Sequence, residues 1–391
     1  MFKSLRKLIN KIYSNKIYTN KIKKFIRYSL LIGIKPTLMK VIGFYKTKEK
    51  SDPIIKNKEF RKYKNKNNVY GIIGCGYYAF SIAAYFIDKF KPRSILGVFD
   101  PNSSNSINLA KWFRARFVYS SAKELISSKK IKMIFICSNH SSHAEYAISA
   151  IKKGKAVHIE KPHVTNYDQI RRLVAVMREN PEVPVFLGFN RPKTYLYKKL
   201  ISYVEKETGP TFMNWFIAGH ELSSDHWYFK PKEGGRIIGN ICHWTDLSLR
   251  IVGIKNAFPL EITSIKSVNS ESDFSITIVF GNGSISNIAF SSKNYLFEGV
   301  RDHLNLHKGN LLAYLKDFHF LDIYKGTRTY KFKTFYKSIG HKENIRNSLL
   351  SEKGEDIDYV QASAILFLAA KQSVDEKRTL IVKDNNLNSI F

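Results

Sequence analysis

The sequence predicts two α/β domains: a parallel sheet covered by helices on both faces, followed by a mostly antiparallel sheet with its own helices. Between residues 69 and 190, short apolar stretches alternate with segments of helical period, which is the pattern of parallel strands buried on both faces. After residue 205, apolar residues alternate singly and Asn-Gly turns appear, which is typical of hairpins. A chain of 391 residues with 44% hydrophobic residues is long enough for two such cores.

A basic extension, residues 1–66, precedes the two domains, which we place at 67–190 and 191–391. Within residues 2–31, apolar side chains recur at spacings of three and four with lysines on the other face, so we expect an amphipathic helix. Such a helix lies on an anionic membrane surface, or it packs on its own protein or on a second subunit. Residues 46–67 are expected to form a polar linker.

The net charge is strongly positive and uneven along the chain. The 64 Lys and Arg residues exceed the 32 Asp and Glu residues by 32. Residues 1–66 hold 20 bases and three acids, a net of +17, so the remainder carries +15. Charge of this kind normally indicates nucleic acid or an anionic membrane. Because the extension has no arginine cluster and no motif that reads nucleic acid, no nucleic-acid partner is predicted.

Cysteine usage and hydropathy indicate the compartment. Cys75, Cys137 and Cys242 are too far apart for a disulfide framework or a zinc site, so no metal is predicted. No apolar run follows the basic N-terminus as a secretory signal requires, and charged residues and Pro36 interrupt the apolar stretch 25–45 well short of a membrane span. We therefore expect a cytoplasmic protein, at most peripheral on the inner membrane face.

The elements of both domains follow from these periods. In the first domain we expect strands at 68–76, 94–101, 131–139, 155–162 and 183–190, helices at 77–90, 121–128, 142–154 and 166–180, and a helix with a short strand within 105–118. In the second domain we expect strands within 209–220, 262–269, 274–292 and 304–325, and helices at 235–253 and 359–376.

The stretch "GIIGCGYYAF" follows the first expected strand and opens the first helix, and it contains Gly74, Gly76 and Ala79 in a Gly-x-Gly-x-x-Ala pattern. In this context the loop brings backbone N–H groups, including those near Tyr77 and Tyr78, close to a pyrophosphate. Asp100 ends the second strand, where a carboxylate accepts hydrogen bonds from a ribose diol and repels a 2′-phosphate. NAD is therefore predicted over NADP, although an Asp before a proline also simply forms turns.

Further motifs resemble the glucose–fructose oxidoreductase/inositol dehydrogenase (Gfo/Idh/MocA) family. They are "HIEKPHV" around Lys161, "CSNHSSHAEYA" at 137–147, "GFNRP" at 188–192 and "EGGRIIGNICHWTDL" at 233–247. The resemblance covers roughly residues 69–382, and the run 218–239 is most similar to members associated with surface polysaccharides.

The resemblance implies a Rossmann domain, an open substrate-domain sheet through which copies of the chain assemble, and hydride transfer between a nicotinamide and a sugar or cyclitol hydroxyl. It implies a Lys-Pro peptide bond that is often cis. The residues that it places at the cofactor are Ser138, Asn139, His143, Glu160, Lys161 and Pro162.

The expected chemistry depends on Lys161, His243 and Asn240. A lysine can donate to the reacting oxygen and stabilise a developing alkoxide, and a histidine can accept the hydroxyl proton near neutral pH. Asn240, three residues before His243, stands where the family usually has Asp. An amide orients a hydroxyl but cannot take a proton, so His243 acts without a neighbouring carboxylate unless Asp225 or Asp246 substitutes for it.

Other residues are candidates for binding the substrate. Asp225, His226 and Trp227 either line a sugar site, where aromatic faces stack on sugar rings, or form a loop anchored by the tryptophan. Arg191 and Arg236 either clamp the phosphates of a nucleotide-linked sugar or form surface ion pairs.

The resulting hypothesis is an NAD-dependent oxidoreductase that acts on a sugar or nucleotide-sugar in surface-polysaccharide synthesis. Two alternatives remain. One is a cyclitol dehydrogenase, and the other is an NAD-binding scaffold of low turnover that is tethered by the basic extension.

Overall fold

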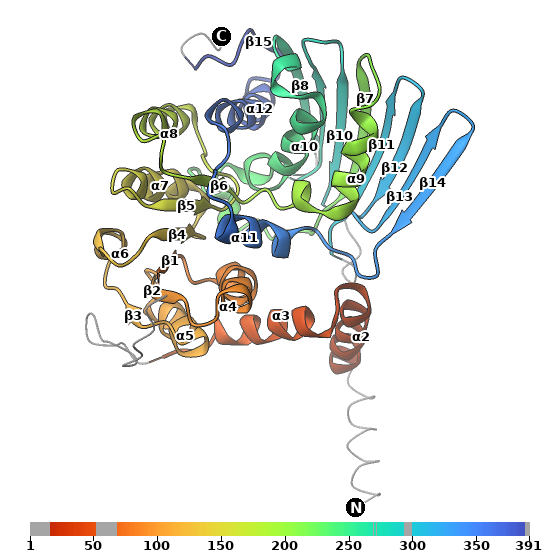
Figure 1. The fold of residues 1–391 in the computed structure, drawn as a ribbon. Helices are drawn as coiled ribbons and strands as arrows, with labels where there is room; N and C mark the ends of the chain where they lie inside the picture. Colours follow the sequence, from red (N-terminus) through yellow and green to blue (C-terminus); the bar gives the residue numbers. More distant parts are fainter. Residues whose placement is uncertain (1–15, 52–68, 269, 271, 293–298, 388–391) are drawn as a thin grey trace, which may run out of the picture.

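The computed structural model describes residues 16–51, 69–268, 270, 272–292 and 299–387. It contains two sheets with flanking helices, and the N-terminal extension lies beside them (Figure 1). The first 15 residues, which include half of the expected amphipathic helix, and most of the expected linker lie outside the described residues.

The first sheet is parallel throughout and has the strand order β3-β2-β1-β4-β5-β6. Side chains alternate between its two faces, since Ile72 and Ile73 belong to separate core clusters. Helices α4 and α5 lie on one face and α7 and α8 on the other (Figure 1). The strands are β1 (Tyr70–Ile73), β2 (Ile95–Phe99), β3 (Phe117–Val118), β4 (Met133–Ile136), β5 (Ala156–Ile159) and β6 (Val185–Leu187).

The helices of this domain follow the expected order, with one local difference. The helix expected at 77–90 contains a π-helical segment, η1, before it continues as an α-helix. Apolar periodicity does not distinguish these two helix types over a single turn. The helices are η1 (Ala79–Ala84), α4 (Tyr85–Phe90), α5 (Ser103–Phe113), α6 (Ala122–Ser127), η2 (His140–Ser142), α7 (His143–Ile151) and α8 (Tyr167–Glu179).

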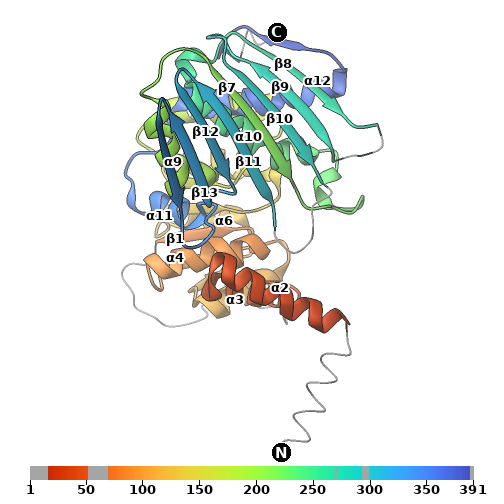
Figure 2. The same cartoon turned by 90° about the vertical axis from the view of Figure 1, so that its right-hand side faces the viewer.

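The second sheet is antiparallel except for the pairing of β7 with β10. Its order is β14-β13-β12-β11-β7-β10-β9-β8-β15, and one face is open (Figure 2). The strands are β7 (Thr211–Ala218), β8 (Leu260–Lys266), β9 (Phe274–Val279), β10 (Ile285–Ser291), β11 (Arg301–Lys308), β12 (Leu311–Lys316), β13 (Phe320–Lys325), β14 (Arg328–Lys333) and β15 (Leu380–Val382). Strands β14 and β15, at the two edges of the sheet, were not expected from the sequence.

Helices cover the other face of this sheet (Figure 1). The long α12 is buried along most of its length, and the helix expected at 235–253 is again divided into a π-helical and an α-helical part. The helices are η3 (Arg191–Lys193), α9 (Tyr195–Val204), η4 (Trp227–Phe229), η5 (Ile237–Ile241), α10 (Cys242–Val252), η6 (Ile254–Asn256), α11 (His341–Leu350) and α12 (Ile357–Glu376). The segment around α11 returns to the first sheet, where Asn344 donates to the backbone oxygen of Leu187.

The N-terminal extension contains α2 (Lys16–Ile32) and α3 (Ile34–Lys46), separated at Gly33, whose φ of 92° breaks the helix. Helix α3 packs on the first domain, because Met39 belongs to its core and a Cβ at Gly43 would lie 2.1 Å from the Ser81 hydroxyl. The backbone oxygen of Leu31 accepts a hydrogen bond of 2.8 Å from the Lys337 amide of the second domain. The described part of the extension therefore packs on its own protein.

The described residues that follow α3, 47–51, contact the first domain. The Asn108 amide donates to the backbone oxygens of Lys46 and Glu49 at 2.9 and 2.8 Å, and the Ser51 hydroxyl donates to Asn108 at 2.6 Å. These contacts were not visible from a polar composition alone. Across the described ranges, no helix combines the length and the apolarity that crossing a bilayer requires.

Candidate functional site

A cavity of about 730 Å³ lies where the order of the first sheet reverses, between the carboxyl ends of β1 and β4. In doubly wound sheets this switch point is where ligands bind. Residues of the second domain form its other side, and most of the predicted site residues line it. Those residues are Gly74, Gly76, Tyr77, Tyr78, Asp100, Ser138, Asn139, His143, Glu160, Lys161, Arg191, His226, Trp227, Arg236, Asn240 and His243.

The two glycines of the first loop have different roles. Gly74 has a φ of 86°, and a Cβ there would lie 2.5 Å from the Ser138 amide nitrogen, so only glycine allows the β1 and β4 loops to approach. A Cβ at Gly76 would meet no atom within 4 Å. The loop therefore leaves open space at Gly76, at the point where a pyrophosphate would approach the helix N-terminus. Ala79 is fully buried behind the loop and does not line the cavity.

Asp100 is held at the edge of this loop. Its carboxylate accepts hydrogen bonds from the backbone amides of Cys75 at 2.7 Å and Asn102 at 2.8 Å. Burial raises the pKa of Asp100, and these two backbone hydrogen bonds oppose that change. A carboxylate at this position fits a ribose diol, and the open space at Gly76 fits a pyrophosphate, so the residues present are compatible with NAD.

The loop after β4 carries three of the predicted residues. The ring nitrogens of His143 lie 2.7 Å from the backbone oxygen of Pro162 and 2.9 Å from that of Ser138, and the histidine is buried. The Asn139 amide donates to Glu233 at 2.6 Å. Glu233 also accepts from the Ser141 hydroxyl at 2.8 Å. These contacts join the loop to the second domain.

Glu160 and Pro162, the two neighbours of Lys161 in the chain, are both buried. The Glu160 carboxylate accepts a hydrogen bond from the Tyr78 hydroxyl and lies 3.1 Å from Nε2 of His158. Burial opposes its ionisation, but His158, Tyr78 and His341 together lower the pKa of Glu160. The Lys161–Pro162 peptide bond is cis, as the resemblance implies, and Pro162 is buried without lining the cavity.

Lys161 is charged within the cavity. Its Nζ donates a hydrogen bond of 2.6 Å to the backbone oxygen of Gly239 and lies 6.0 Å from the centroid of the Tyr228 ring. Burial opposes the ammonium form, but the neighbouring Tyr228, Cys242 and Glu160 outweigh it and raise the pKa of Lys161. The side chain can therefore donate a proton in a hydrogen bond to a reacting oxygen.

His243, in contrast to Lys161, is uncharged in the cavity. Burial, followed by the charges of Arg191 and Lys161, lowers the pKa of His243 well below its usual value. The imidazole is therefore neutral near pH 7, and its Nδ1 has no hydrogen-bond partner among the described residues. Asn240 accepts a hydrogen bond of 3.0 Å from Arg236, so its amide oxygen is directed toward an arginine.

Neither carboxylate that we considered as a substitute for the missing Asp lies in the cavity. Asp225 is exposed on the preceding loop, and Asp246 is buried on the far side of α10, where the Arg250 guanidinium lies 3.2 Å from it and the Tyr359 hydroxyl donates to it. This part of the sequence-based interpretation is wrong. His243 and Asp246 lie three residues apart in the same α-helix, and the sequence did not show that the site faces His243 while Asp246 turns toward Arg250 and Tyr359.

The two arginines line the cavity but have protein partners. Arg191 is buried and pairs with Asp302, with Nε 3.3 Å from Oδ1, and its guanidinium lies over the Trp244 ring. Arg236 is buried, donates to Asn240 and to the backbone oxygen of His220, and lies over the Phe290 ring. They are thus not surface ion-pair residues, and much of their hydrogen-bonding capacity is already used.

Several residues at the cavity were missed. Tyr228 lies beside Lys161, and His140 packs against the rings of Trp227 and Tyr228 with centroid distances of 4.6 and 4.5 Å. Glu233 was also missed, although it is buried and ties the domains together. The signal for Tyr228 was its place next to "DHW", but only the fold brings that loop to Lys161.

The fold and the cavity define a two-domain protein whose Rossmann-type parallel sheet has a cavity at its switch point. Residues 69–189 match the model of the oxidoreductase family with an NAD-binding Rossmann fold, GFO_IDH_MocA. This match and the fold support the Gfo/Idh/MocA resemblance, and the predicted fold class is confirmed.

Curated relatives, one of them an uncharacterised oxidoreductase and another an inositol dehydrogenase, also match parts of the chain. The chain is 32% identical over 111 residues to an uncharacterised oxidoreductase of Streptococcus pneumoniae, covering 28% of this chain and 29% of that one. It is 24% identical over 296 residues to a myo-inositol 2-dehydrogenase of Thermotoga maritima, covering 68% and 84%. The alignments with the first two curated relatives span only 29% and 36% of those proteins.

Solved structures share the fold. GenD2 from gentamicin A biosynthesis, in complex with NAD, has a TM-score of 0.68 at 17% identity and covers 82% of this chain and 97% of its own. Levoglucosan dehydrogenase with NADH and levoglucosan has a TM-score of 0.68 at 16% identity, with coverages of 80% and 98%.

Proposed function

We propose that this protein is an NAD-dependent oxidoreductase that acts on a hydroxyl group of a sugar or a related polyol. The observation that carries the proposal is that an ammonium group, Lys161, and a neutral imidazole, His243, line the same cavity as the open glycine loop. The relatives that act on inositol and levoglucosan support a polyhydroxy substrate.

The residues divide the chemistry between them. When bound, NAD supplies the hydride acceptor. Lys161 donates a hydrogen bond to the substrate oxygen that becomes a carbonyl and stabilises the negative charge that develops on it. His243 accepts the hydroxyl proton because its lowered pKa keeps it unprotonated. Asn240 orients a second hydroxyl through its amide.

Tyr228 is a second candidate for the proton transfer. Its ring lies beside the Lys161 ammonium, and a phenol hydroxyl is one of the groups that can transfer a proton to or from a reacting oxygen. Replacing Tyr228 by Phe distinguishes the two routes, since it removes the hydroxyl without changing the shape of the ring. If His243 is the only proton acceptor, this variant keeps most of its turnover.

The test uses the full chain, NAD, and a panel of nucleotide-sugars, free sugars and myo-inositol, with NADH formation followed by absorbance. Lys161→Ala should lower turnover by about 10²–10³-fold while NAD affinity changes little. Lys153→Ala, which removes an exposed lysine at the end of α7, is the matched control. Unchanged turnover in Lys161→Ala would contradict the proposed chemistry. NAD binding without turnover on any substrate would favour the scaffold alternative.

We also propose that the enzyme serves surface-polysaccharide biosynthesis, on the basis of the resemblance of residues 218–239.

We further propose that copies of the chain assemble through the open face of the second sheet. Phe212, Phe216, Tyr314 and Tyr324 are all exposed on that sheet, and exposed apolar patches of this kind often mark interfaces. Sedimentation velocity on Phe212→Asp with Phe216→Asp should show a smaller species than the wild type. Equal sedimentation of both would contradict the interface.

Finally, we propose that the extension rests on an anionic membrane surface. Ile22, Ile26 and Leu30 on α2 and Ile34 and Leu38 on α3 are exposed by 44, 52, 75, 62 and 42%, and residues 1–66 carry a net charge of +17. Apolar side chains flanked by lysines match such a surface.

Co-sedimentation with vesicles of phosphatidylcholine, with and without phosphatidylserine, tests the membrane proposal. Binding should require phosphatidylserine, weaken with added salt, and fall in Leu30→Asp. Val268→Asp, which changes an exposed valine elsewhere, should bind as the wild type does. Binding that is unaffected by Leu30→Asp would contradict the proposal.

A further inference from the structure

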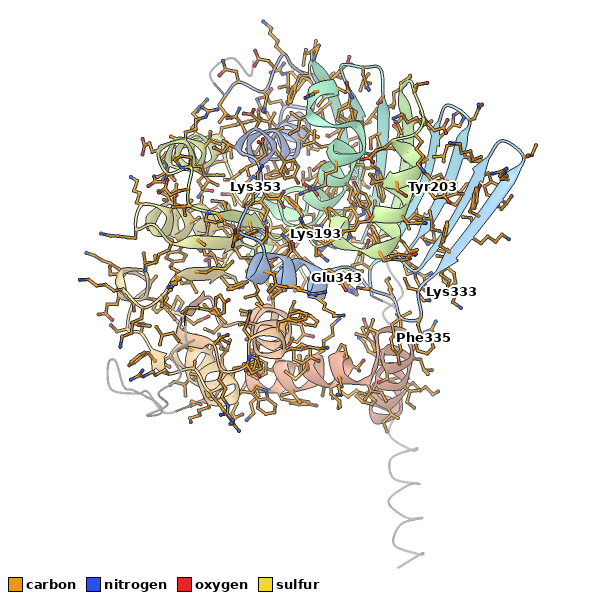
Figure 3. The ribbon with its side chains drawn as sticks, in the orientation of Figure 1. Lys193, Tyr203, Lys333, Phe335, Glu343 and Lys353 are labelled. Atoms are coloured by element: carbon orange, nitrogen blue, oxygen red, sulfur yellow. The ribbon has the colours of Figure 1, made fainter. Side chains whose placement is uncertain are left out.

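A second cavity, of about 400 Å³, lies beside the first one and beneath the N-terminal extension. Its walls come from α2 and α3, the first helix of the Rossmann domain, the segment from the end of β14 into α11, and, in the second domain, Arg191, His220 and part of 299–302. The two cavities share the lining residues Arg191, His220, Val300, Ile339 and His341, so they adjoin each other. In Figure 3, Phe335 lies above α2 and Glu343 lies on α11, at the two ends of this segment.

The extension is held against this cavity by specific contacts. The Lys337 amide donates to the Leu31 oxygen at 2.8 Å, and a Cβ at Gly33 would lie 3.7 Å from the Tyr336 ring. On the other side, α3 contributes Met39 to the core of the first domain. Lys40, the next residue, is therefore fixed in position and partly buried at the cavity wall.

Positive charges predominate in the lining. Five lysines and arginines line the cavity against two acids, a difference of +3: Lys40, Lys89, Arg191, Lys337 and Lys342 against Asp302 and Glu343. Both acids already have partners, because Asp302 pairs with Arg191 at 3.3 Å and Glu343 lies 4.0 Å from Lys342.

Arg191, Lys337 and Lys342 each lie within 4.0 Å of an acid, whereas the partly buried Lys40 and the exposed Lys89 have no ion-pair partner among the described residues. Lys40 contacts the Tyr28 ring, whose centroid is 5.5 Å from Nζ. Burial and the charge of Lys337 lower the pKa of Lys40. Burial also lowers the pKa of Lys337, although Asp317 and Asp302 oppose this. Two half-buried ammonium groups thus destabilise each other, and an anion between them would relieve the repulsion.

We propose that this second cavity binds a phosphate-bearing group attached to the substrate, so that the sugar in the first cavity is carried as a diphosphate ester. The inference rests on the proposed function, because it assigns the substrate class of the same site. Lysine ammonium groups bind phosphate as point charges. The pyrophosphate of NAD is accounted for by the glycine loop in the first cavity, so the second cavity is available to the substrate.

The group attached to the other end of the diphosphate is either a nucleoside or a lipid. Both share the diphosphate that Lys40 and Lys337 would contact. The adjoining walls include Tyr28, Leu31 and Phe86, which offer aromatic and apolar surface to either one.

The test is calorimetric titration of the full chain, saturated with NAD and in 150 mM salt, with inorganic pyrophosphate. Pyrophosphate should bind to the NAD complex, and Lys40→Gln should weaken binding about tenfold or more. Lys40→Arg should restore it. The matched control is Lys35→Gln, which removes an exposed lysine from the same helix that does not line the cavity and should leave binding unchanged.

Uridine diphosphate glucose and farnesyl diphosphate then distinguish the two sources, since the better ligand of the pair identifies the attached group. Equal weakening in Lys35→Gln and Lys40→Gln would mean that only the overall positive charge attracts the anion, which overturns the inference. So would unchanged affinity in Lys40→Gln. The NAD affinity of the wild type and of each variant is measured separately. A wild type that does not bind NAD refutes the proposed function, whereas pyrophosphate that does not bind to the NAD complex overturns only this inference.

Discussion

The two glycines of the first loop should fail in different ways when each is replaced by alanine. Gly74 has a positive φ of 86°, and its missing Cβ would lie 2.5 Å from the Ser138 amide and 2.6 Å from the Cys137 carbonyl carbon. Both are backbone atoms, which cannot rotate away as a side chain does. Gly76 has no such neighbours, since a Cβ there would meet nothing within 4 Å.

The expected magnitudes follow from these distances. In Gly74→Ala, a left-handed backbone costs about 1–2 kcal/mol, and a forced shift of the β4 loop costs about 1–3 kcal/mol more. The free energy of unfolding should therefore fall by about 2–5 kcal/mol. In Gly76→Ala it should change by no more than about 1 kcal/mol, but the new methyl group occupies the space for the pyrophosphate. NAD affinity should then fall about tenfold or more, which corresponds to one or two lost hydrogen bonds to a charged group.

Urea unfolding followed by circular dichroism measures the first effect, and calorimetric titration with NAD measures the second. The two variants serve as controls for each other. Wild-type NAD affinity in Gly76→Ala would show that the loop does not cradle the pyrophosphate. An unchanged unfolding midpoint in Gly74→Ala would show that the close approach of the β1 and β4 loops is not needed for the fold.

Three further changes test the electrostatics. Asp100→Asn should shift the NADP-to-NAD affinity ratio toward NADP by about tenfold, because a neutral amide no longer repels a 2′-phosphate; an unchanged ratio would limit Asp100 to holding the Cys75 amide. Asn240→Asp should raise the pKa of His243 and move the acid limb of the pH–rate profile to higher pH, and a profile identical to that of the wild type would exclude coupling between the two residues. Burial lowers the pKa of His163 to about 4, so the unfolded state takes up this proton first as pH falls and stability is lost between about pH 6.5 and 4. The loss approaches about 1.4 kcal/mol per pH unit, and His163→Gln should show a shallower dependence in urea unfolding at pH 7, 5.5 and 4.5; equal slopes would refute this assignment.

Much of the first domain was predictable because its signals are local. Each buried parallel strand is a short apolar run bounded by turn residues, and each helix carries its own period. The glycine loop was predictable for the same reason, since a positive φ and a close approach restrict the residue at a single position such as Gly74. Similarity of motifs then identified Lys161 and His243, both of which line the cavity.

Contacts between segments far apart in the sequence were harder to predict from the sequence. Asp225 and Asp246 were considered as partners of His243, but Asp225 is exposed on a loop and Asp246 is directed toward Arg250 and Tyr359 rather than into the cavity. Tyr228 and Glu233 belong to a loop without a regular period, and only its docking on the first domain brings them to Lys161 and Asn139.

The sequence by itself determined the alternation of the first domain, the residue types at the cofactor loop and the excess of lysine in the extension, because each depends on near neighbours or on composition. The tertiary structure alone decided what those lysines face. Lys40 and Lys337 come from opposite ends of the chain and meet at one cavity because α3 packs on the first domain while the segment after β14 binds the end of α2. Such a meeting depends on the packing of whole elements, which no local pattern of residues encodes.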